Sequence, residues 1–369
     1  MRRLTVVQLL PALHSGGVER STLEIAAALV AAGHRSVVVS AGGRLVAPLL
    51  AGGSEHIELP IGAKSLRAFA TMRRLRKVLA ALKPDIVHAR SRLPGWLGWF
   101  ALRGLPAPRP RFVTTVHGLN SPGRYSSILC RGERVVCVSG TVRAHVLRQW
   151  PGTDPAKLQV IERGIDPAQF PRGHRPDAAW RARFASDLPA LQGGRLLLLP
   201  GRGTRLKGHA DAIRLLAALR AGGEDARLWL LGAREPGREA YLAEIEALAA
   251  SLGVAAALAI SEPRSDVLDA YGAADLVLQV SNKPEAFGRT VLEALSVGRP
   301  VLGWAHGGVG ELLGTLYPAG AVPPGDHVAL AAAARALLAA PPPVPVTMPH
   351  TLAALQSATL DLYASLVSD

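Results

Sequence analysis

The chain has 369 residues, of which 49% are hydrophobic and 19% charged, and its 42 Lys+Arg against 28 Asp+Glu give a formal net charge of +14. This hydrophobic fraction excludes an intrinsically disordered chain, and the length favours two domains over one. The 2 cysteines cannot form a disulfide framework, so we expect a reducing compartment, and no apolar run reaches the ~20 residues that span a bilayer.

The excess positive charge has two interpretations. One is an anionic partner such as nucleic acid, a membrane surface or an acidic substrate. The other is compositional, because nearly all of the charge is arginine in a chain that is also rich in Ala, Gly and Pro. Aromatic residues make up only 5% and no stacking motif accompanies the arginines, so we expect no nucleic-acid partner.

Short β-branched or leucine-rich runs alternate with helix-period segments, which is typical of α/β proteins with parallel sheets. In the first half we expect strands at 4–10, 36–40, 56–59, 86–89, 112–116, 134–138 and 159–162, and helices at 18–32, 65–82, 93–102 and 141–150. In the second half we expect strands at 195–199, 227–231, 257–260, 276–279 and 300–303, and helices at 209–221, 238–252, 265–271 and 288–297. The pattern therefore predicts two doubly wound sheets.

Composition predicts the domain boundaries. Residues 163–181 are rich in Pro, Arg and Gly and lack periodicity, which is typical of an interdomain connection. Residues 341–345 (PPPVP) form a stiff spacer before an amphipathic segment at 351–367, which we expect to be a helix that docks on the first domain. We predict domains at 1–168 and 169–349, with the terminal helix in 350–369.

Open α/β sheets bind ligands beyond the carboxyl ends of their strands, and four loops in such places carry candidate chemistry. The first contains Gly16 and Gly17 and opens a helix, so its N–H groups suit an anion, although a tight turn alone explains it as well. The second, 200–209 (PGRGTRLKGH), places Arg202 and Lys207 at another helix start, a composition typical of diphosphate binding. A solvated basic loop is its alternative interpretation.

The third loop spans 283–295 (KPEAFGRTVLEAL). Glu285 precedes a helix and Glu293 lies about two turns inside it beside core residues, where an unpaired carboxylate is costly. Carboxylates on both sides of helix-start N–H groups suit a ligand with hydroxyls and phosphates, and an N-cap region with a surface glutamate is the alternative. The fourth loop carries His117 at the end of a strand, where a structural histidine is the alternative.

Together these segments resemble the retaining glycosyltransferases of the group 1, or family-4, class, and bacterial lipopolysaccharide-core glycosyltransferases are similar. The most specific part is the E-x7-E motif from Glu285 to Glu293 within PEAFGRTVLEALSVGRPV, supported by GRGTRLKG, GGVER and the strand-end HG. The resemblance covers nearly the whole chain. It implies the GT-B fold, with two Rossmann-like domains, an interdomain cleft and a C-terminal helix that returns to the N-terminal domain.

The resemblance also implies roles for individual residues. Arg202 and Lys207 would neutralise the donor diphosphate, Glu293 would bind ribose hydroxyls, and Glu285 and His117 would hold the transferred sugar. The residues implied to be catalytic are Glu285, His117, Arg202 and Lys207. Those implied to bind the nucleotide sugar are Gly16, Gly17, Arg202, Lys207, Arg264, Glu285, Ala286, Phe287, Gly288, Thr290 and Glu293.

Two segments depart from the family pattern. The family usually has Asn-Gly where this chain has Arg163-Gly164 after Glu162, and a glycine is common near 262–266, where the base would bind. The motifs therefore support the prediction that a nucleotide binds more strongly than they support the prediction of which nucleotide it is.

These expectations combine into a retaining transfer of a sugar from a nucleotide-diphosphate sugar, with UDP the expected nucleotide, to a glycan or glycolipid acceptor. The pathway we expect is synthesis of lipopolysaccharide core or another envelope glycan. No cofactor and no metal are expected, because preorganised cations and N–H groups can stabilise the departing diphosphate. Retention arises by double displacement on a carboxylate or by front-face substitution, which the resemblance favours. The alternatives are a sugar-nucleotide epimerase or phosphorylase of the same fold and a non-catalytic sugar-nucleotide-binding partner.

The helix expected at 65–82 has an apolar face and an opposite basic face. The basic residues are Arg67, Arg73, Arg74 and Lys77. A solvated surface explains them, and the functional interpretation is contact with anionic lipid, to which each basic residue contributes roughly 1 kcal/mol. We therefore expect a cytoplasmic protein, peripheral on the inner face of the cytoplasmic membrane. An acceptor-facing surface is expected to include Arg90, Ser91, Arg92, Trp96 and Trp99.

Overall fold

The computed structural model describes residues 2–14, 16–63 and 68–367. It consists of two compact units, one formed by Met1–Arg163 with Leu352–Asp369 and the other by Gly164–Thr351. The boundary expected from composition fell after residue 168, with the terminal segment starting at 350. The structure divides the chain after Arg163 because the Ile165 N–H donates to the His350 carbonyl (3.1 Å) and Ile165 forms a parallel bridge with Thr351.

The first unit contains a seven-stranded sheet in the order β3-β2-β1-β4-β5-β6-β7, with every neighbouring pair parallel. Its strands are β1 (Thr5–Leu9), β2 (Arg35–Ser40), β3 (Glu55–Glu58), β4 (Ile86–Ala89), β5 (Arg111–Val116), β6 (Arg134–Cys137) and β7 (Leu158–Val160). The α-helices of this unit are α1 (Gly17–Ala31), α2 (Val46–Ala51), α3 (Ala68–Leu82), α4 (Arg92–Arg103), α5 (Gly140–Gln149) and α13 (Leu352–Val367).

The two faces of this sheet are covered by different helices because successive strand residues point to opposite sides. Val7 of β1 belongs to a buried cluster with Leu75 of α3, whereas its neighbour Val6 belongs to a cluster with Ile25 of α1 and Leu362 of α13. A sheet that is buried on both faces explains why its strands are nearly continuous hydrophobic runs such as TVVQL in β1.

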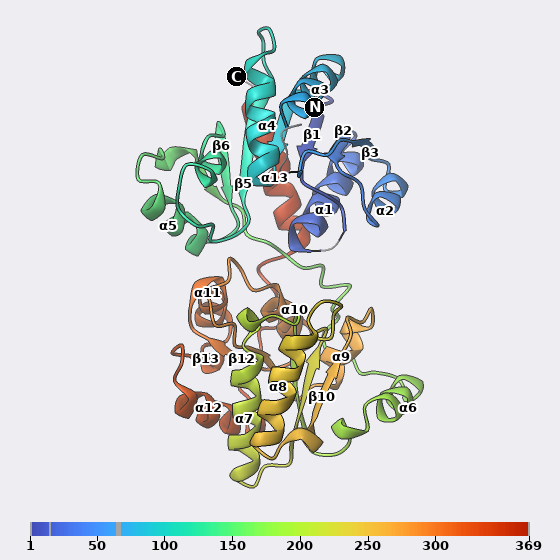
Figure 1. Ribbon diagram of the computed structural model, residues 1–369, viewed down its shortest axis with the longest axis vertical. Coiled ribbons are helices and arrows are strands. Elements are labelled where there is room, and N and C mark those ends of the chain that lie inside the picture. Colours follow the sequence, from blue (N-terminus) through green and yellow to red (C-terminus); the bar gives the residue numbers. More distant parts are fainter. Residues whose placement is uncertain (1, 15, 64–67, 368–369) are drawn as a thin grey trace. The chain divides into compact units, whose positions relative to one another are not determined.

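Helix α13 belongs to the first unit although it ends the chain. Figure 1 shows it in red among the blue helices of that unit, and it packs against α1. The Gln356 side chain donates to the Glu24 carbonyl (2.9 Å), and the buried Tyr363 hydroxyl lies 2.5 Å from His88 Nδ1. The expected return of the terminal helix to the N-terminal domain is confirmed.

The second unit contains a six-stranded parallel sheet in the order β10-β9-β8-β11-β12-β13. Its strands are β8 (Arg195–Pro200), β9 (Ala226–Leu231), β10 (Leu258–Ser261), β11 (Leu276–Gln279), β12 (Val301–Trp304) and β13 (Ala321–Val322). The α-helices of this unit are α6 (Ala178–Asp187), α7 (His209–Ala221), α8 (Glu239–Ser251), α9 (Val267–Ala273), α10 (Arg289–Val297), α11 (Gly307–Leu316) and α12 (His327–Ala339). Two doubly wound sheets were expected, and both are present.

Each sheet reverses its strand order once, and ligands of open α/β sheets bind beyond the strand ends at that point. In the first unit β1 lies between β2 and β4, and in the second β8 lies between β9 and β11. The loops after β1, β8 and β11 contain three of the four segments with candidate chemistry. The topology therefore places those segments where such sheets bind ligands.

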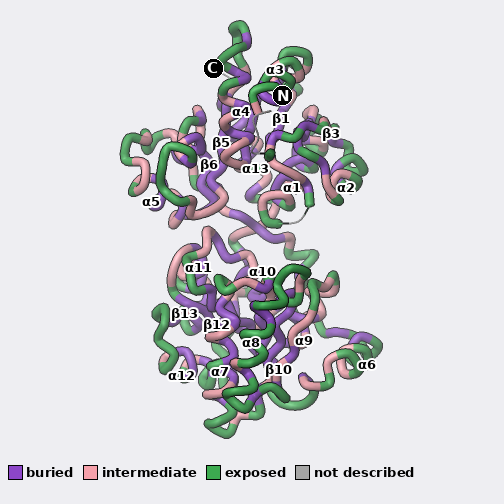
Figure 2. The backbone as a smooth tube through the Cα atoms, viewed as in Figure 1, coloured by how far each residue is buried: buried purple, intermediate pink, exposed green. Residues whose placement is uncertain are grey.

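Burial follows the same plan in both units. Figure 2 shows the strands as buried and the outer surfaces of helices such as α6 as exposed. Within residues 2–14, 16–63 and 68–367, no helix combines the length and the apolar character needed to cross a membrane.

Candidate functional site

The loop after β8 is held against two neighbouring strand ends by glycines. A Cβ on Gly203 would lie 2.1 Å from the Ala233 carbonyl oxygen, and one on Gly208 would lie 1.8 Å from that of Val280. Gly208 also has a φ of +74°, which L side chains rarely adopt. Helix α7 begins directly after this loop. The glycines therefore fix the backbone positions of the basic residues in the loop.

Lys207 of this loop meets Glu285 of the loop after β11. Lys207 Nζ lies 2.6 Å from Glu285 Oε1, and the Ser281 hydroxyl donates to the same carboxylate oxygen at 2.5 Å. The Lys207 and Glu285 side chains are each 25% exposed. Two residues predicted to be catalytic are thus brought together, and Ser281 is a partner that sequence reasoning missed.

Arg202 remains available for an anion. It is exposed, and its guanidinium has no hydrogen-bond or ion-pair partner within the part of the chain that the structure describes. Because Glu285 offsets the charge of Lys207, Arg202 is the uncompensated cation of this loop.

The loop that carries Glu285 is positioned by the start of α11. The Gly308 N–H donates to the Glu285 carbonyl at 2.8 Å, and the His306 Nε2 atom lies 2.8 Å from the Ser281 carbonyl oxygen. A Cβ on Gly308 would lie 2.4 Å from Phe287 Cα. Sequence reasoning missed Gly307 and Gly308, although paired glycines after a strand were the signal it used at Gly16 and Gly17.

Helix α10 begins where this loop ends. Gly288 is its N-cap with a φ of +121°, and Arg289 and Thr290 are its first two residues. The first N–H groups of an α-helix have no acceptor within the helix itself. Ala286 and Phe287 precede the cap, and Phe287 is buried in the core of the unit. The positive end of the helix dipole and these N–H groups form an arrangement that suits a phosphate.

Glu293 lies inside α10, and only 7% of its surface is exposed. The Tyr271 hydroxyl donates to its Oε2 at 2.8 Å, and Arg289 Nε lies 3.7 Å from its Oε1. The carboxylate is therefore buried but partnered, which removes the cost expected for an unpaired charge. Tyr271 is a further residue that the sequence did not single out.

Arg264, expected near the base, is held by a neighbouring carboxylate. Its Nε and Nη2 atoms donate to the two oxygens of Asp266 at 2.8 and 2.7 Å, and Trp180 Nε1 donates to Asp266 Oδ2 at 2.6 Å. The hydrogen bond from Arg264 is the main reason that the pKa of Asp266 falls to about 2. A role for Arg264 in binding the base stays a prediction.

In the first unit, one arginine joins two candidate loops. Arg163 Nη1 donates to the Gly17 carbonyl at 2.5 Å, and Arg163 Nη2 lies 2.6 Å from His117 Nδ1. Gly16 caps α1 with a φ of +139°. In the sequence, Arg163 was only a departure from the family pattern. Its contacts with His117 and Gly17 became visible only in the structure.

The His117 ring is half enclosed by a polar cluster. Its Nε2 atom is buried and has no hydrogen-bond partner among the described residues. Burial lowers the pKa of His117 well below its ordinary value, and the charges of Arg163 and Arg90 lower it further. His117 is therefore a neutral imidazole at physiological pH.

The expectation that Arg90 faces an acceptor is wrong. Arg90 is only 4% exposed, and its guanidinium donates to Gln8 Oε1 at 2.6 Å and to the Ser21 hydroxyl at 2.7 Å. A buried guanidinium must donate its hydrogen bonds to acceptors inside the protein, because water does not reach it. Arg90 supports the interior of the first unit.

The basic face expected on α3 is present where the structure describes it. Arg73, Arg74 and Lys77 are exposed, while Arg67 lies outside the described residues. The guanidinium of Arg73 stacks 4.6 Å from the ring centroid of Phe69, which is 60% exposed. The surface thus combines cations with an exposed aromatic ring.

The adjacent helix α4 continues this character. Phe100 is 48% exposed and stacks on Trp96, and Arg103 lies 4.3 Å from the ring centroid of Trp99. Arg131 lies over both tryptophan rings. The arginines and aromatic rings of α3 and α4 form cation–π pairs at the surface of the first unit.

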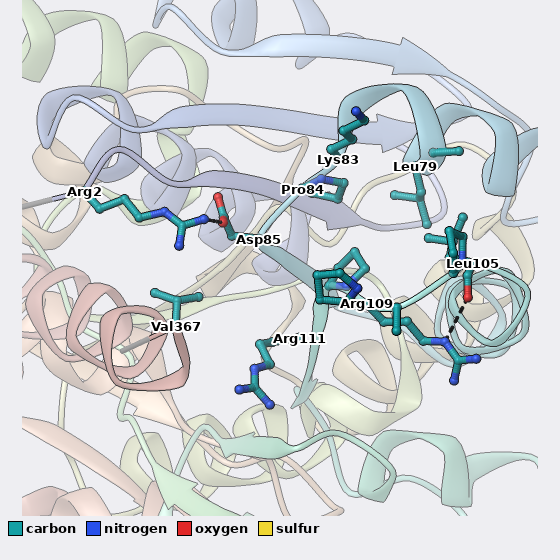
Figure 3. A pocket seen from close by; sticks show the side chains of 14 residues that line it. Arg2, Leu79, Lys83, Pro84, Asp85, Leu105, Arg109, Arg111 and Val367 are labelled. Atoms are coloured by element: carbon teal, nitrogen blue, oxygen red, sulfur yellow. Dashed lines mark hydrogen bonds and ion pairs between the residues drawn. The ribbon is translucent and has the colours of Figure 1, made fainter. Parts of the chain in front are cut away.

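A separate cavity of about 610 Å³ lies at the amino ends of β1, β4 and β5. In Figure 3, Arg2 points toward Asp85 and Arg109 toward the Leu105 carbonyl, to which Arg109 Nε donates at 3.0 Å. Prolines form much of its wall. The cavity contains none of the predicted site residues and lies at the sheet edge opposite to the candidate loops, so we do not assign it to the nucleotide sugar.

Comparison with known families agrees with this geometry. Residues 15–169 match the family described as Glycosyltransferase Family 4, and residues 182–348 match the family described as Glycosyl transferases group 1. A D-inositol 3-phosphate glycosyltransferase of Salinispora tropica is 30% identical over 287 residues, which are 70% of this chain and 57% of that protein. The chain thus spans little more than half the length of this relative.

Solved structures show the same fold. A glycosyltransferase from Rickettsia africae ESF-5 has a TM-score of 0.84 at 26% identity, with 100% of both chains covered. Anabaena Alr3699/HepE, in complex with UDP and glucose, has a TM-score of 0.80 at 18% identity, over 98% of this chain and 100% of that one. WaaG, a glycosyltransferase involved in lipopolysaccharide biosynthesis, has a TM-score of 0.66 at 19% identity, over 98% of each chain. The expected GT-B fold and the resemblance to the group 1, or family-4, glycosyltransferases are confirmed.

Proposed function

Because the chain belongs to the group 1 glycosyl transferases, with family 4 matching its N-terminal half, we propose that it is a retaining glycosyltransferase that uses a nucleotide-diphosphate sugar. The observation that carries the proposal is the convergence of Lys207, Glu285 and the start of α10 beside the free cation Arg202. These groups supply both the positive charge and the oxygen acceptor that such a donor requires.

Bond cleavage between sugar and phosphate leaves negative charge on the diphosphate. Lys207 is held by Glu285 and the α10 N–H groups belong to the backbone, so both stabilise that charge with little reorganisation, and Arg202 adds a free cation. We propose on this basis that the reaction needs no metal ion and no other cofactor.

Glu285 orients the transferred sugar in this proposal. Its Oε1 accepts from both Lys207 and Ser281, and a carboxylate engaged in this way is a weak nucleophile. This supports front-face substitution, in which the departing phosphate takes the proton of the acceptor hydroxyl. Double displacement would instead require a carboxylate free to attack the anomeric carbon.

UDP is the nucleotide we propose. HepE, which shares the fold, was solved in complex with UDP and glucose. We propose that Glu293 binds the ribose, and the support is its position just over one turn inside the helix whose start would bind the phosphates.

The acceptor we propose is a glycan or glycolipid of the cell envelope, of the lipopolysaccharide-core kind. The support is the cationic and aromatic surface of α3 and α4, which suits an anionic lipid headgroup at the cytoplasmic face of a membrane. The curated relative is named for D-inositol 3-phosphate, so a phosphorylated polyol is the competing acceptor.

The direct test is incubation of the full chain with a panel of nucleotide sugars, with and without EDTA, and measurement of donor hydrolysis and of transfer. We expect one uridine-diphosphate sugar to be turned over at the same rate in EDTA. No binding of any nucleotide sugar would overturn the enzyme assignment. Activity that EDTA abolishes and Mg²⁺ restores would overturn metal independence.

A further inference from the structure

We propose that Arg163 is a positioning residue that holds His117 as the neutral tautomer with its proton on Nε2, so that His117 presents an N–H donor to the donor sugar. The inference rests on the proposed function for the identity of the ligand, but its claim about the ring is independent of it. Its basis is the pair of contacts from one guanidinium, at 2.6 Å to His117 Nδ1 and 2.5 Å to the Gly17 carbonyl.

The tautomer follows from what a guanidinium can do. Arginine has five N–H donors and no acceptor, and it stays protonated in proteins. A nitrogen that lies 2.6 Å from Arg163 Nη2 must therefore offer a lone pair, so His117 Nδ1 carries no proton. The single proton of the neutral ring is then on Nε2, because the bond at one ring nitrogen determines the state of the other.

The doubly protonated ring is excluded by the same contact. An imidazolium has a proton on both nitrogens, and its Nδ1–H would face an N–H of Arg163. The charged and titratable groups that act on the ring are Arg163, Arg90 and His88, of which the two arginines are positive. The surroundings of His117 therefore oppose a second proton.

This tautomer leaves His117 with an N–H donor at Nε2. This atom is buried, and within the described part of the chain nothing accepts its proton. A buried donor without a partner is rare in proteins, and it indicates an acceptor that the protein chain does not itself supply. A hydroxyl oxygen of the transferred sugar is that acceptor in our proposal.

A water molecule is the competing acceptor. A cavity of about 10 Å³ is lined by His117, Arg90, Thr115 and Arg163, which is about the least space that holds one water. The two acceptors differ in an observable way, because only the sugar would change the environment of Nε2 when the donor is added.

The contact with the Gly17 carbonyl means that Arg163 positions a backbone segment as well as the His117 ring. By donating to the Gly17 carbonyl, the same guanidinium fixes the first peptide of α1, next to the Gly16 cap. The orientation of His117 and the glycine turn are thus coupled through one side chain.

The test begins with the wild-type protein. Histidine labelled with ¹⁵N reports the tautomer directly, and a His117→Asn spectrum assigns the signal. We expect Nδ1 without and Nε2 with a proton from about pH 8 to about pH 5. A proton on Nδ1, or a ring that becomes doubly protonated in that range, would overturn the proposal without any Arg163 variant having to fold.

Variants then separate positioning from bulk structure. Arg163→Met should give a mixture of tautomers and an increase in ring protonation near pH 6, and Arg163→Lys should restore the wild-type tautomer in part. The matched control is Arg148→Met, an exposed arginine of α5 in the same unit, which should leave the His117 signals unchanged. Identical His117 spectra in wild type and Arg163→Met would refute the role of Arg163.

Kinetics supply the second readout. For Arg163→Met we expect kcat to fall at least about tenfold with a smaller change in KM, and the acidic limb of the kcat/KM profile to move to higher pH. An acidic limb that stays in place would contradict the inference. If the tautomer is as expected but no nucleotide sugar shifts the Nε2 signal, the water is the acceptor and the sugar contact is wrong. If no nucleotide sugar binds at all, the proposed function fails while the tautomer assignment stands.

Discussion

At the scale of single residues, the candidate site is a set of charges that are already paired. Lys207 is bound to Glu285, Glu293 accepts from Tyr271, and Arg264 is held by Asp266. Such pairs fix the side chains before a ligand arrives, which is the condition for electrostatic stabilisation without reorganisation. Arg202 differs, because within the described residues its guanidinium has no partner.

Replacement of Glu285 tests whether this residue acts in sugar transfer and not in binding of the nucleotide. In Glu285→Gln the side-chain volume is kept but the charge that pairs with Lys207 is lost. We expect kcat to fall about 10²- to 10³-fold while the affinity for UDP, measured by calorimetry, stays within a few-fold. Glu246→Gln is the matched control, because Glu246 likewise forms an ion pair with a basic residue, Arg234, in the same unit. Unchanged turnover in Glu285→Gln would remove this residue from the mechanism.

At the scale of elements, the starts of α7, α10 and α11 and the loops before them are shaped by glycines at which a side chain would clash. The clash distances at Gly208 and Gly308 are 1.8 and 2.4 Å, in both cases to backbone atoms. Backbone atoms cannot move aside as flexible side chains do, so these positions set the separation of the loops after β8, β11 and β12. The geometry around Glu285 is therefore a product of backbone packing.

Helix α3 carries the prediction about membranes. Neutralising Arg73 and Arg74 together should weaken binding to vesicles of phosphatidylglycerol and phosphatidylcholine about 30-fold at low salt, since each charge contributes roughly 1 kcal/mol. Sedimentation of the vesicles at two salt concentrations measures this.

The control for the vesicle experiment is Arg181→Gln with Arg183→Gln, two exposed arginines of α6 in the other unit. This pair removes the same charge from the chain and should leave binding nearly unchanged. If both pairs weaken binding equally, net charge alone would be responsible, and the surface of α3 and α4 would have no special role.

At the scale of the whole molecule, both units bury histidines that are held neutral. Burial lowers the pKa of His88 and His117 in the first unit well below its usual value, and it lowers that of His209 in the second unit to about 4. The unfolded chain takes up protons on these residues near pH 6.5, whereas the folded chain does not. The unfolded state therefore binds more protons below that pH, and stability falls with it.

We expect the free energy of unfolding of each unit to decrease as the pH falls from about 7 to about 5. The slope is up to about 1.4 kcal/mol per pH unit for each such histidine below pH 6.5. Asp266 does not affect this window, because its stabilising contribution is lost as the pH falls from about 4, its usual pKa, to its folded pKa of about 2. Thermal unfolding across the range measures the effect.

A wild-type unfolding temperature that is constant or rises between pH 7 and pH 5 would contradict the burial of neutral histidines.

Some elements were beyond the reach of sequence patterns. Helix α11 reads GGVGELLGTL, and its glycines are poor helix formers, so only its packing on the loop at Glu285 and Phe287 explains it. Helix α6 lies at the end of the segment interpreted as a connection. It is stabilised by Asp177, which accepts from the Trp180 N–H at 2.6 Å, and by the stacking of Trp180 on Phe184 at 4.9 Å.

By itself, the sequence determined the two parallel sheets, the family and the loops that carry the site. Strand burial, helix periodicity and the E-x7-E spacing are local patterns, and local patterns can be read along a chain. The tertiary structure alone decided the partners of those residues: Lys207 with Glu285, Tyr271 with Glu293, Arg163 with His117, and Arg90 inward. Each of these depends on how separate strand ends pack together, and the spacing of residues along the sequence does not encode that packing.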